Sequence, residues 1–273
     1  MRGIILSGGT GTRLYPVTKI ISKQLLPVYD RPMIYYPLAT LMSAGLREIL
    51  LITTARDLPM YQALWGDGEQ FGITLQYKTQ EKAGGIAQAL LLGEEFVGDE
   101  PFALILGDNL FFGENMGEKI ADALRRAQIG TNTVFGYPVD DPYRFGVAEL
   151  DKDGKLLSIE EKPACPKSRY AVVGLYVYAH QALNMAKRLK PSPRGELEIT
   201  DLNNLCLKDN VLEMQLLDDG TVWYDAGTPD SLLDAGLFVR AQKAKNSGMC
   251  PTPVEIAHRN GWIADNNRKE RAF

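Results

Sequence analysis

The sequence predicts an α/β protein with a mostly parallel central sheet, helices on both faces of that sheet, and an extension rich in strands. Three observations lead to this prediction. Apolar runs alternate with helical segments through the first half of the chain, a glycine-rich loop directly follows the first apolar run, and β-branched and aromatic runs replace the alternation from about residue 138. At 273 residues, the chain is long enough for one large domain of this kind.

The elements of the first half can be placed from their apolar patterns. Pro37 is expected to bend the first long helix, and Gly45 to end it. Ligands of parallel α/β sheets bind at the carboxyl ends of the strands, so residues that follow these strands are candidates for a site. Strands are predicted at 3–6, 48–54, 73–78, 102–106 and 131–137, and helices at 32–44, 57–65, 85–96 and 116–128.

The second half continues from the first and shares one cleft with it, because no linker or internal repeat separates the two. We therefore expect a single domain over 1–273, with parts at about 1–137 and 138–245 and a C-terminal helical segment at 246–273. A polar turn at 151–154 marks a hairpin. One strand is predicted to end near 149, and further strands are predicted at 156–161, 170–178, 211–217 and 221–224. Helices are predicted at 180–189 and 229–245, and another is predicted to follow 201.

Composition and charge exclude several classes of protein. With 30 basic and 34 acidic residues, the net charge is -4 and the pI is about 5.4, so no overall positive field favours nucleic acid. The 3 cysteines form no C-x-x-C pair, and 2 histidines are too few for a multi-histidine metal site. No apolar run approaches the roughly 18 residues of a membrane span, and none resembles a signal peptide. We expect a cytoplasmic protein that binds neither nucleic acid nor membranes.

A glycine-rich loop follows the first predicted strand and reads SGGTGTR over residues 7–13. Glycines let backbone N–H groups approach an anion closely, and Arg13, Lys19 and Lys23 add positive charge nearby. The dinucleotide fingerprint G-x-G-x-x-G fails because Leu14 stands where it needs glycine, and G-x-x-x-x-G-K-[ST] does not occur. An ordinary βα turn explains the glycines equally well, but not the cations. The segment is therefore interpreted as a phosphate loop.

Aspartates follow two of the predicted strands. Asp108 follows 102–106 and Asp225 follows 221–224, and carboxylates at strand ends could hold the divalent metal that accompanies a polyphosphate. A helix cap or a turn explains Asp108 equally well. The separation of 117 positions (225 minus 108) leaves open whether the two carboxylates meet. Gln80 could read a nucleobase edge or lie in solvent, and the charged run at 160–163 could form a polar pocket or a solvated edge.

Several motifs in this order resemble the sugar-1-phosphate nucleotidyltransferase family, and most closely its glucose-1-phosphate thymidylyltransferase branch, over essentially the whole chain. The resemblance implies a nucleotide-diphospho-sugar transferase fold, which is a Rossmann-like sheet with a sugar-binding extension. It also implies thymidylyl transfer from dTTP to glucose 1-phosphate with release of pyrophosphate, Mg²⁺ as cofactor, and a homo-oligomer (dimer or tetramer). The motifs are SGGTGTRL at 7–14, KQLLPV at 23–28, LGDN at 106–109, EKP at 161–163, GELEITD at 195–201 and WYDAGT at 223–228.

The resemblance also implies roles for individual residues. Arg13 and the loop N–H groups would hold the phosphates that leave, Lys23 would approach the α-phosphate, and Lys162 would hold the sugar phosphate. Asp108 and Asp225 are the implied ligands of Mg²⁺. The implied nucleotide-binding residues are Leu6, Gly8, Gly9, Thr10, Gly11, Thr12, Arg13, Gln24, Gln80, Gly85 and Asp108, and the implied sugar-binding residues are Phe145, Gly146, Glu161, Lys162 and Val172.

Three positions that we expect near the sugar pocket depart from the family's usual sequence by lacking a hydroxyl, namely Phe145, Val173 and Ala226. Because a lost partner of a substrate hydroxyl changes discrimination, a related or deoxy hexose phosphate is an alternative to glucose 1-phosphate. Uracil is an alternative to thymine. From another class, a silent nucleotide-sugar-binding regulator is an alternative that the retained cations and carboxylates disfavour. A nicotinamide dehydrogenase is more distant, since Leu14 interrupts its fingerprint.

Overall fold

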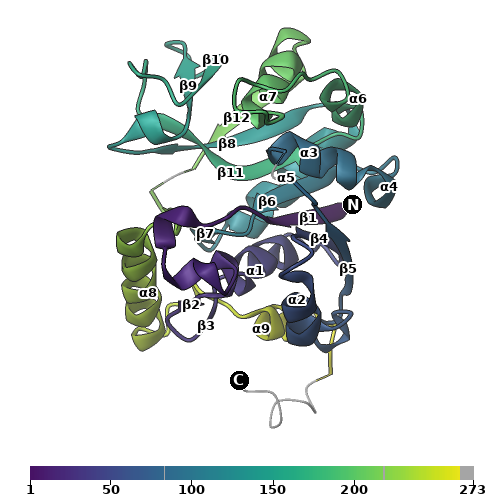
Figure 1. The fold of residues 1–273 in the computed structure, drawn as a ribbon, viewed down its shortest axis with the longest axis vertical. Coiled ribbons are helices and arrows are strands. Elements are labelled where there is room, and N and C mark those ends of the chain that lie inside the picture. Colours follow the sequence, from purple (N-terminus) through teal and green to yellow (C-terminus); the bar gives the residue numbers. More distant parts are fainter. Residues whose placement is uncertain (83, 218, 265–273) are drawn as a thin grey trace.

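The computed structural model describes residues 1–82, 84–217 and 219–264. Within these residues, nine strands form one continuous sheet (Figure 1). They are β1 (Arg2–Ser7), β4 (Glu48–Thr53), β5 (Thr74–Thr79), β6 (Phe102–Leu106), β8 (Asn132–Pro138), β9 (Gly146–Leu150), β10 (Leu156–Glu161), β11 (Tyr170–Tyr178) and β12 (Leu212–Leu216). The sheet order is β10-β9-β11-β6-β1-β4-β5, and β8 joins it by pairing with both β11 and β12.

The first half of the chain builds the parallel part of this sheet. β1 lies between β4 and β6, so that Ile5 aligns with Leu51 on one side and with Ile105 on the other. All three side chains are fully buried, because helices cover both faces of the sheet. β4 in turn pairs in parallel with β5. The carboxyl ends of β1, β4, β5 and β6 therefore share one edge of the sheet.

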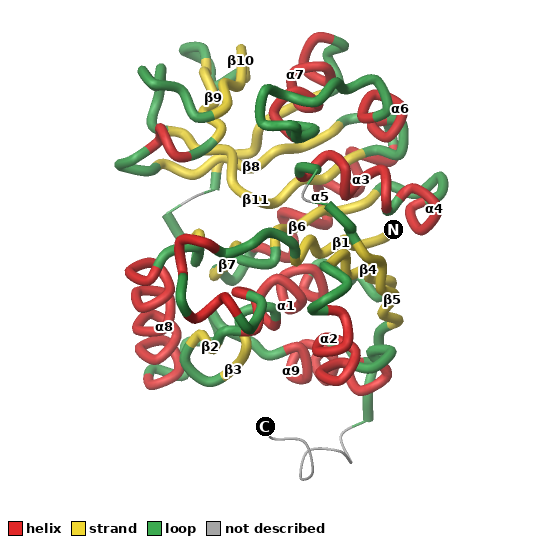
Figure 2. Tube along the Cα trace, viewed as in Figure 1, coloured by secondary structure: helices red, strands yellow, loops and turns green. Residues whose placement is uncertain are grey.

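Helices cover both faces, which confirms the predicted α/β fold (Figure 2). Ile5 packs into the core on one face, and its neighbour Ile4 packs into the core on the other. One face carries α1 (Tyr35–Ser43), α2 (Leu58–Trp65), α5 (Met116–Gln128) and α9 (Pro253–Arg259), and the other carries α3 (Ile86–Leu92), α4 (Glu94–Val97), α6 (Ala182–Ala186) and α7 (Ile199–Lys208).

The second half extends the sheet with antiparallel pairs. β11 pairs antiparallel with β6, β8 and β9, and β9 pairs antiparallel with β10. Within β11, Leu175 lies opposite Ile105 of the parallel part, whereas Val172 lies opposite Gly146 of the extension. One long strand thus connects the edge where the parallel strands end with the hairpin of the second half.

A smaller sheet crosses the carboxyl edge of the main one. It pairs β7 (Asn109–Phe112) antiparallel with β13 (Val222–Asp225), and α8 (Pro229–Ala244) packs against it. α8 starts in a capping box, because the Thr228 side chain accepts from the Ser231 N–H while the Ser231 hydroxyl accepts from the Thr228 N–H. No helix in the part of the chain that the structure describes is long and apolar enough to cross a membrane.

The remaining elements are short. A two-stranded ribbon joins β2 (Pro27–Val28) to β3 (Arg31–Pro32). The 3-10 turns are η1 (Thr12–Leu14), η2 (Val17–Lys19), η3 (Lys23–Leu25), η4 (Glu69–Phe71) and η5 (Pro142–Arg144).

The structure differs from the predicted elements in several places. The helix predicted to follow 201 is α7, which already begins at Ile199. The first helix begins at Tyr35 rather than at 32, because Arg31–Pro32 forms β3. The helix predicted at 85–96 divides at Gly93, where a Cβ would lie 2.8 Å from Cδ1 of Ile4. The helix predicted at 180–189 shortens to α6, and β7 was not predicted at all. Of the helical segment predicted at 246–273, α9 is helical, whereas 265–273 lie outside the described residues.

Candidate active site

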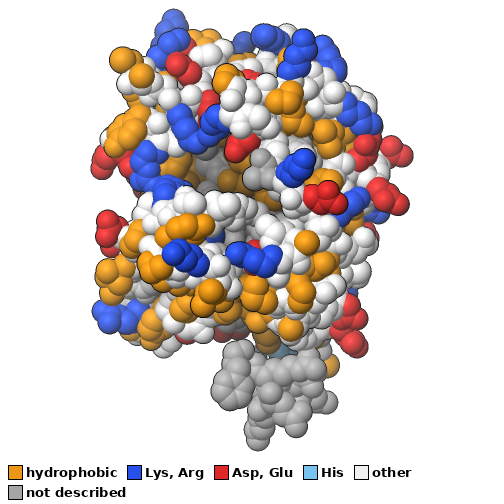
Figure 3. All heavy atoms as spheres, in the orientation of Figure 1, with side chains coloured by type: hydrophobic (Ala, Val, Ile, Leu, Met, Phe, Trp, Pro, Cys, Tyr) orange, Lys and Arg blue, Asp and Glu red, His pale blue; other side chains and the backbone are white. Residues whose placement is uncertain are grey.

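A cleft opens where the carboxyl ends of β1 and β6 meet β11 and the smaller sheet. Figure 3 shows the hollow, with lysine and arginine side chains around it. Its lining comes from both halves of the chain, as the sequence predicted for a shared cleft. The lining includes Arg13, Asp108, Asn109, Arg144, Phe145, Gly146, Glu161, Lys162, Val172, Gly174, Tyr176, Arg194, Glu196, Glu198, Thr200, Trp223 and Asp225.

The glycine-rich loop emerges from β1 at the edge of this cleft. Leu6 is buried at the end of β1, whereas Gly9, Thr10 and Thr12 are exposed. Gly9 and Gly11 adopt φ of 91° and 60°, in the left-handed region that glycine enters without steric cost. A Cβ on Gly11 would also lie 3.1 Å from the Thr18 side chain. These glycines therefore shape a loop whose backbone is open to an anion, as the phosphate-loop interpretation requires.

Two aspartates meet in the cleft although they are far apart in sequence. In the smaller sheet Asp225 pairs with Asn109, so it lies beside Asp108. The amino group of Lys23 donates a hydrogen bond to Oδ2 of Asp108. Nη2 of Arg13 lies 3.6 Å from Oδ2 of Asp225. The pairing of β7 with β13 thus joins residues that their sequence separation left unconnected.

The two carboxyl groups differ in their proton affinity. Burial raises the pKa of Asp108, but the charge and hydrogen bond of Lys23 outweigh burial and hold this pKa below its usual range. The pKa of Asp225 is raised, first by burial and then by the negative charge of Asp108, and nearby cations offset only part of this effect. Two adjacent carboxyl groups of this kind at the edge of a cleft could hold a divalent cation.

The donor set of this pair fits Mg²⁺ better than a fully protein-bound metal. Mg²⁺ usually binds through one or two carboxylates and completes its shell with water and substrate phosphates. Asp108 and Asp225 supply two carboxylates, and within residues 1–82, 84–217 and 219–264 no group of three or more histidine, cysteine, aspartate or glutamate side chains could hold a metal. The aspartate pair therefore suits a divalent metal that takes its remaining ligands from water and substrate phosphates.

Asn109 positions the carboxylate pair, a role that the sequence analysis missed. Its Oδ1 accepts from the Gly174 N–H at 3.0 Å and from Nε1 of Trp223 at 2.8 Å. Its Nδ2 donates to Oδ1 of Asp108 at 3.3 Å. One buried amide therefore connects β11, β13 and Asp108. Its place in the LGDN motif was visible in the sequence, but its partners were not.

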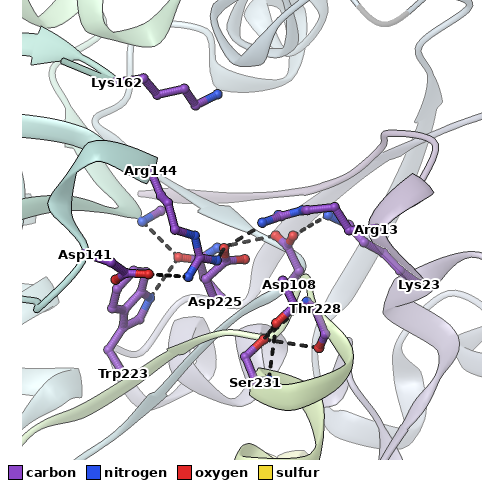
Figure 4. Close-up of polar contacts among 12 residues, drawn as sticks. Arg13, Lys23, Asp108, Asp141, Arg144, Lys162, Trp223, Asp225, Thr228 and Ser231 are labelled. Carbon is purple, nitrogen blue, oxygen red and sulfur yellow. Dashed lines mark hydrogen bonds and ion pairs between the residues drawn. The ribbon is translucent and has the colours of Figure 1, made fainter. Parts of the chain in front are cut away.

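Arg144 is a second residue that the sequence analysis missed. Nη2 of Arg144 lies 3.6 Å from Oδ2 of Asp225, and Nη1 donates to Asp141 at 2.6 Å. Figure 4 shows Arg13, Lys23 and Arg144 converging on the two aspartates, while Lys162 lies apart from this group. Three cations thus surround one carboxylate pair. The sequence offered one indication of this role, because Arg144 directly precedes Phe145, which the resemblance had placed near the sugar.

The five residues that the resemblance placed near the sugar all line the cleft. Oε2 of Glu161 accepts from the Thr200 hydroxyl at 2.6 Å, and Nζ of Lys162 lies 3.6 Å from Oε1 of Glu161. Lys162 has φ of 46°, an unusual conformation for a residue with a side chain, and its N–H donates to the Phe145 carbonyl at 2.9 Å. The strained backbone directs this lysine at the cleft rather than along the strand.

Arg194 lies beside these residues and had no predicted role. It makes a forked contact with Glu198, with Nε and Nη2 at 3.2 and 2.8 Å from the two carboxylate oxygens. The same Nη2 lies 3.7 Å from Oε1 of Glu161. Lys162 and Arg194 thus form a second cationic group of the cleft, beside Glu161. Gly195 to Asp201 had been recognised as a motif, and Arg194 immediately precedes it.

The two glutamines have different surroundings. Gln24 is only 1% exposed beneath the glycine-rich loop, where its Oε1 accepts from the Ser22 hydroxyl at 2.6 Å and its Nε2 donates to the Gly8 carbonyl at 3.3 Å. Gln80 is half-buried, and its Oε1 lies 3.3 Å from where a Cβ of Gly8 would be. Gly85 has a packing reason of its own, because a Cβ there would lie 2.3 Å from the Leu197 carbonyl oxygen.

Of the three positions that lack a hydroxyl, only Phe145 lines the cleft. Its ring packs edge-on against Trp223, with centroids 5.3 Å apart. Val173 is fully buried in the core on the opposite face of β11, because side chains alternate along a strand and its neighbour Val172 faces the cleft. Ala226 is fully buried in the cluster under α8. The expectation that all three lie near the sugar pocket is therefore wrong for Val173 and Ala226, whose side chains are buried away from the cleft.

Comparisons with known proteins identify the family of this chain. A family model described as nucleotidyl transferase matches residues 2–242. A glucose-1-phosphate thymidylyltransferase of Neisseria gonorrhoeae is 52% identical over 272 residues, covering 100% of this chain and 94% of the relative. One of Mycobacterium tuberculosis is 50% identical over 273 residues, covering 100% and 93%. A solved structure from Bacillus anthracis, described as a candidate glucose-1-phosphate thymidylyltransferase in complex with sucrose, superposes with a TM-score of 0.80 at 45% identity, covering 88% and 95%.

Proposed function

Because the chain belongs to the nucleotidyl transferase family, we propose that it transfers a thymidylyl group from dTTP to glucose 1-phosphate, giving dTDP-glucose and pyrophosphate. The observation that carries the proposal is the arrangement of charge in the cleft. Arg13 and Lys23 lie on the loop side, Lys162 and Arg194 lie on the sugar side, and a carboxylate pair lies in the cleft with them. Two anionic substrates can thus be held against their mutual repulsion.

The chemistry requires positioned charge and no general base. A phosphate oxygen of the sugar phosphate is already an anionic nucleophile near neutral pH. It attacks the α-phosphorus of dTTP in line, a new P–O bond forms, and the bond between the α-phosphorus and the bridging oxygen breaks as pyrophosphate leaves. Holding both phosphates in reach and stabilising the charge that develops supplies most of the rate. This requirement agrees with the absence of histidine from the cleft lining within the described residues.

We assign roles on the nucleotide side by position in the cleft. Arg13 and the N–H groups of Gly8 to Thr12 would hold the departing phosphates, and Lys23 would approach the α-phosphate. Gln80 would face the base, with Gly85 beside it. Gln24, buried under Gly8, would support the loop and not lie openly against the base, since it is 1% exposed. Leu6 would form the floor at the end of β1.

On the sugar side, Lys162 together with Arg194 would hold the phosphate of the hexose. Glu161 would accept hydrogen bonds from hexose hydroxyls, since its carboxylate already lies at the cleft surface with one hydroxyl partner. Gly146 and Val172 would leave room for the ring, and the aromatic face of Phe145 would border it.

Asp108 and Asp225 would hold Mg²⁺. When bound, the ion neutralises phosphate charge and draws the triphosphate to the carboxylate pair. The chain's own contribution is to keep Asp108 ionised and to hold the two carboxyl groups adjacent. Lys23 lowers the pKa of Asp108, Asn109 fixes the orientation of the Asp108 carboxylate, and the pairing of β7 with β13 brings Asp225 beside it.

The test is pyrophosphate release from a panel of nucleoside triphosphates and sugar 1-phosphates in the presence of Mg²⁺. We expect the highest kcat/KM with dTTP and glucose 1-phosphate. Best turnover with UTP, or with another hexose phosphate, would replace this substrate pair with a uridylyl transfer or a different sugar. Binding of dTDP-glucose without pyrophosphate formation from any pair would show a nucleotide-sugar-binding regulator in place of an enzyme.

Assembly and location belong to the same proposal. We propose a homo-oligomer, either a dimer or a tetramer, and exposed Leu233 and Leu237 on successive turns of α8 offer apolar surface for a subunit contact. Sedimentation velocity of the purified protein distinguishes a monomer from either assembly.

We place the reaction in the cytoplasm, a reducing compartment compatible with the three free cysteines Cys165, Cys206 and Cys250.

A further inference from the structure

We propose that Gln88, together with the Gly85 carbonyl, sets which end of the Gln80 amide faces the nucleobase, and thereby favours thymine and uracil over cytosine. This inference rests on the proposed function, because it concerns base selection in the same cleft. Gln88 lies on α3, outside the glycine-rich loop, and none of the motifs recognised in the sequence includes it. It acts through Gln80 and is therefore a positioning residue.

Both amide hydrogens of Gln80 are already used. Nε2 of Gln80 donates to Oε1 of Gln88 at 2.6 Å and to the Gly85 carbonyl oxygen at 3.3 Å. An amide nitrogen has two hydrogens, so none remains for a ligand. The other end of the group, Oε1, lies toward the glycine-rich loop, 3.3 Å from where a Cβ of Gly8 would be. Gln80 therefore presents an acceptor to the nucleotide side.

The direction of the Gln80 amide is set by two acceptors together, Oε1 of Gln88 at 2.6 Å and the Gly85 carbonyl at 3.3 Å, of which the Gly85 carbonyl cannot turn over. If the Gln80 amide were flipped, its oxygen would face the Gly85 carbonyl, and two acceptors would repel one another. The Gly85 segment is itself held by Leu197, whose N–H donates to the Gly84 carbonyl at 2.8 Å and whose carbonyl accepts from Ala87 at 3.2 Å. The Gln80 backbone is fixed as well, because its N–H donates to the Thr53 carbonyl at 2.7 Å.

Gly84 leaves space for the Gln88 amide beside Gln80. A Cβ on Gly84 would lie 2.4 Å from Oε1 of Gln88 and 2.6 Å from its Nε2. Only glycine at this position lets the amide lie against the backbone. α3 begins at Ile86, directly after the two glycines, which places Gln88 in its first turn, within reach of Gln80. Gly84 and Gln88 thus form one arrangement that orients Gln80.

An acceptor at Oε1 selects bases by the protonation of N3. Thymine and uracil carry a hydrogen on N3 and can donate it to Gln80. Cytosine has an unprotonated N3, and its lone pair would face the lone pairs of Oε1. A site built to receive an N–H rejects an analogue that lacks it, because the buried acceptor is left unpaired. Gln88 should therefore affect the choice between thymine and cytosine, and not the choice between thymine and uracil.

The experiment measures kcat/KM for dTTP, dUTP and dCTP in the parent enzyme and in Gln88→Leu, which removes the acceptor at similar size. We expect the dTTP to dCTP ratio to fall about tenfold, because the shorter of the two hydrogen bonds that orient the Gln80 amide is lost and only the 3.3 Å contact with the Gly85 carbonyl remains. The dTTP to dUTP ratio should stay unchanged. Both ratios are independent of the fraction of folded enzyme, so a loss of stability cannot produce the predicted pattern.

Two further variants complete the test. Gln88→Glu retains an acceptor for Nε2 of Gln80 and should retain the parent dTTP to dCTP ratio. Gln128→Leu makes the same change as Gln88→Leu at an exposed position ending α5, and should leave all ratios unchanged. An unchanged dTTP to dCTP ratio in Gln88→Leu overturns the inference, as does equal loss in Gln88→Glu. Failure of the parent enzyme to use dTTP would instead overturn the proposed function, so the two failures are distinguishable.

Discussion

Replacing Asn109 by alanine separates the structural role of this residue from its role at the metal site. The change leaves two buried donors, the Gly174 N–H and Nε1 of Trp223, without the acceptor they share. Each buried unsatisfied donor costs about 1–3 kcal/mol, so the free energy of unfolding should fall by roughly 4 kcal/mol. For a chain of this size, that loss lowers the melting temperature by about 8–15 °C.

The same substitution removes the hydrogen bond from Nδ2 to Asp108. Partners of metal ligands typically contribute about 10–100-fold to metal affinity or activity. We therefore expect the Mg²⁺ concentration for half-maximal turnover to rise within that range. Thermal unfolding followed by circular dichroism measures the first effect, and Mg²⁺ titration of pyrophosphate release, well below the melting temperature, measures the second.

Asn132→Ala is the matched control. Asn132 is also buried, and its side chain accepts from the Ala179 N–H at 2.9 Å and donates to the Val211 carbonyl at 2.9 Å, at the end of β11 that lies away from the cleft. The free energy of unfolding of Asn132→Ala should fall by a similar or slightly smaller amount than that of Asn109→Ala. Its Mg²⁺ requirement should equal that of the parent enzyme. If Asn109→Ala and Asn132→Ala have the same kinetic parameters, Asn109 does not position Asp108 and the reasoning is wrong.

Two further predictions concern the charged groups of the cleft. Arg13→Ala should lower turnover about 10²–10³-fold, with stability changed by no more than about 0.5 kcal/mol because the side chain is half-exposed; near-normal turnover in the folded variant would contradict its role. Asp225→Asn should raise the Mg²⁺ requirement at all pH values. Because burial and Asp108 raise the pKa of Asp225 in the folded protein, the ionised carboxylate lowers stability as pH rises through that pKa. Without metal, the asparagine variant should therefore melt at or above the parent temperature near neutral pH and lose this advantage in acid; a lower melting temperature near neutral pH would contradict the raised pKa.

Local patterns predicted the long elements of the core well. The strand at 102–106 and the long strand at 170–178 occur where the sequence placed them, because both are continuous apolar runs bounded by turn residues. The helix at 116–128 also agrees with its periodicity. In each of these segments the pattern repeats over enough residues to specify one structure, and helices on both faces follow from the alternation.

The pairing of β7 with β13 could not be read from the sequence. β7 has four residues and begins immediately after the turn that contains Asp108, so its pattern is too short to show a period. Its partner lies more than a hundred residues later, and such pairings depend on the assembled fold. The meeting of Asp108 with Asp225, and with it the contacts of Asn109 and Arg144, were therefore inaccessible from spacing alone.

Other differences could have been predicted from strand geometry. Val172 and Val173 are neighbours on β11, so only one of them can face the cleft. Arg144 and Arg194 each adjoin a recognised segment, and cations beside a phosphate site are candidates on charge alone. By contrast, the φ of 46° at Lys162 has no sequence signal, since lysine rarely adopts this conformation.

A crystal structure with dTDP-glucose and Mg²⁺ tests the central claim most directly, namely that one cleft holds both phosphates around the carboxylate pair. We predict that the thymidylyl phosphate lies near Lys23, that the sugar phosphate contacts Lys162 and Arg194, and that the metal binds Asp108 and Asp225. The thymine N3–H should donate to Oε1 of Gln80. A product bound outside this cleft, or a metal that contacts neither aspartate, would contradict the account.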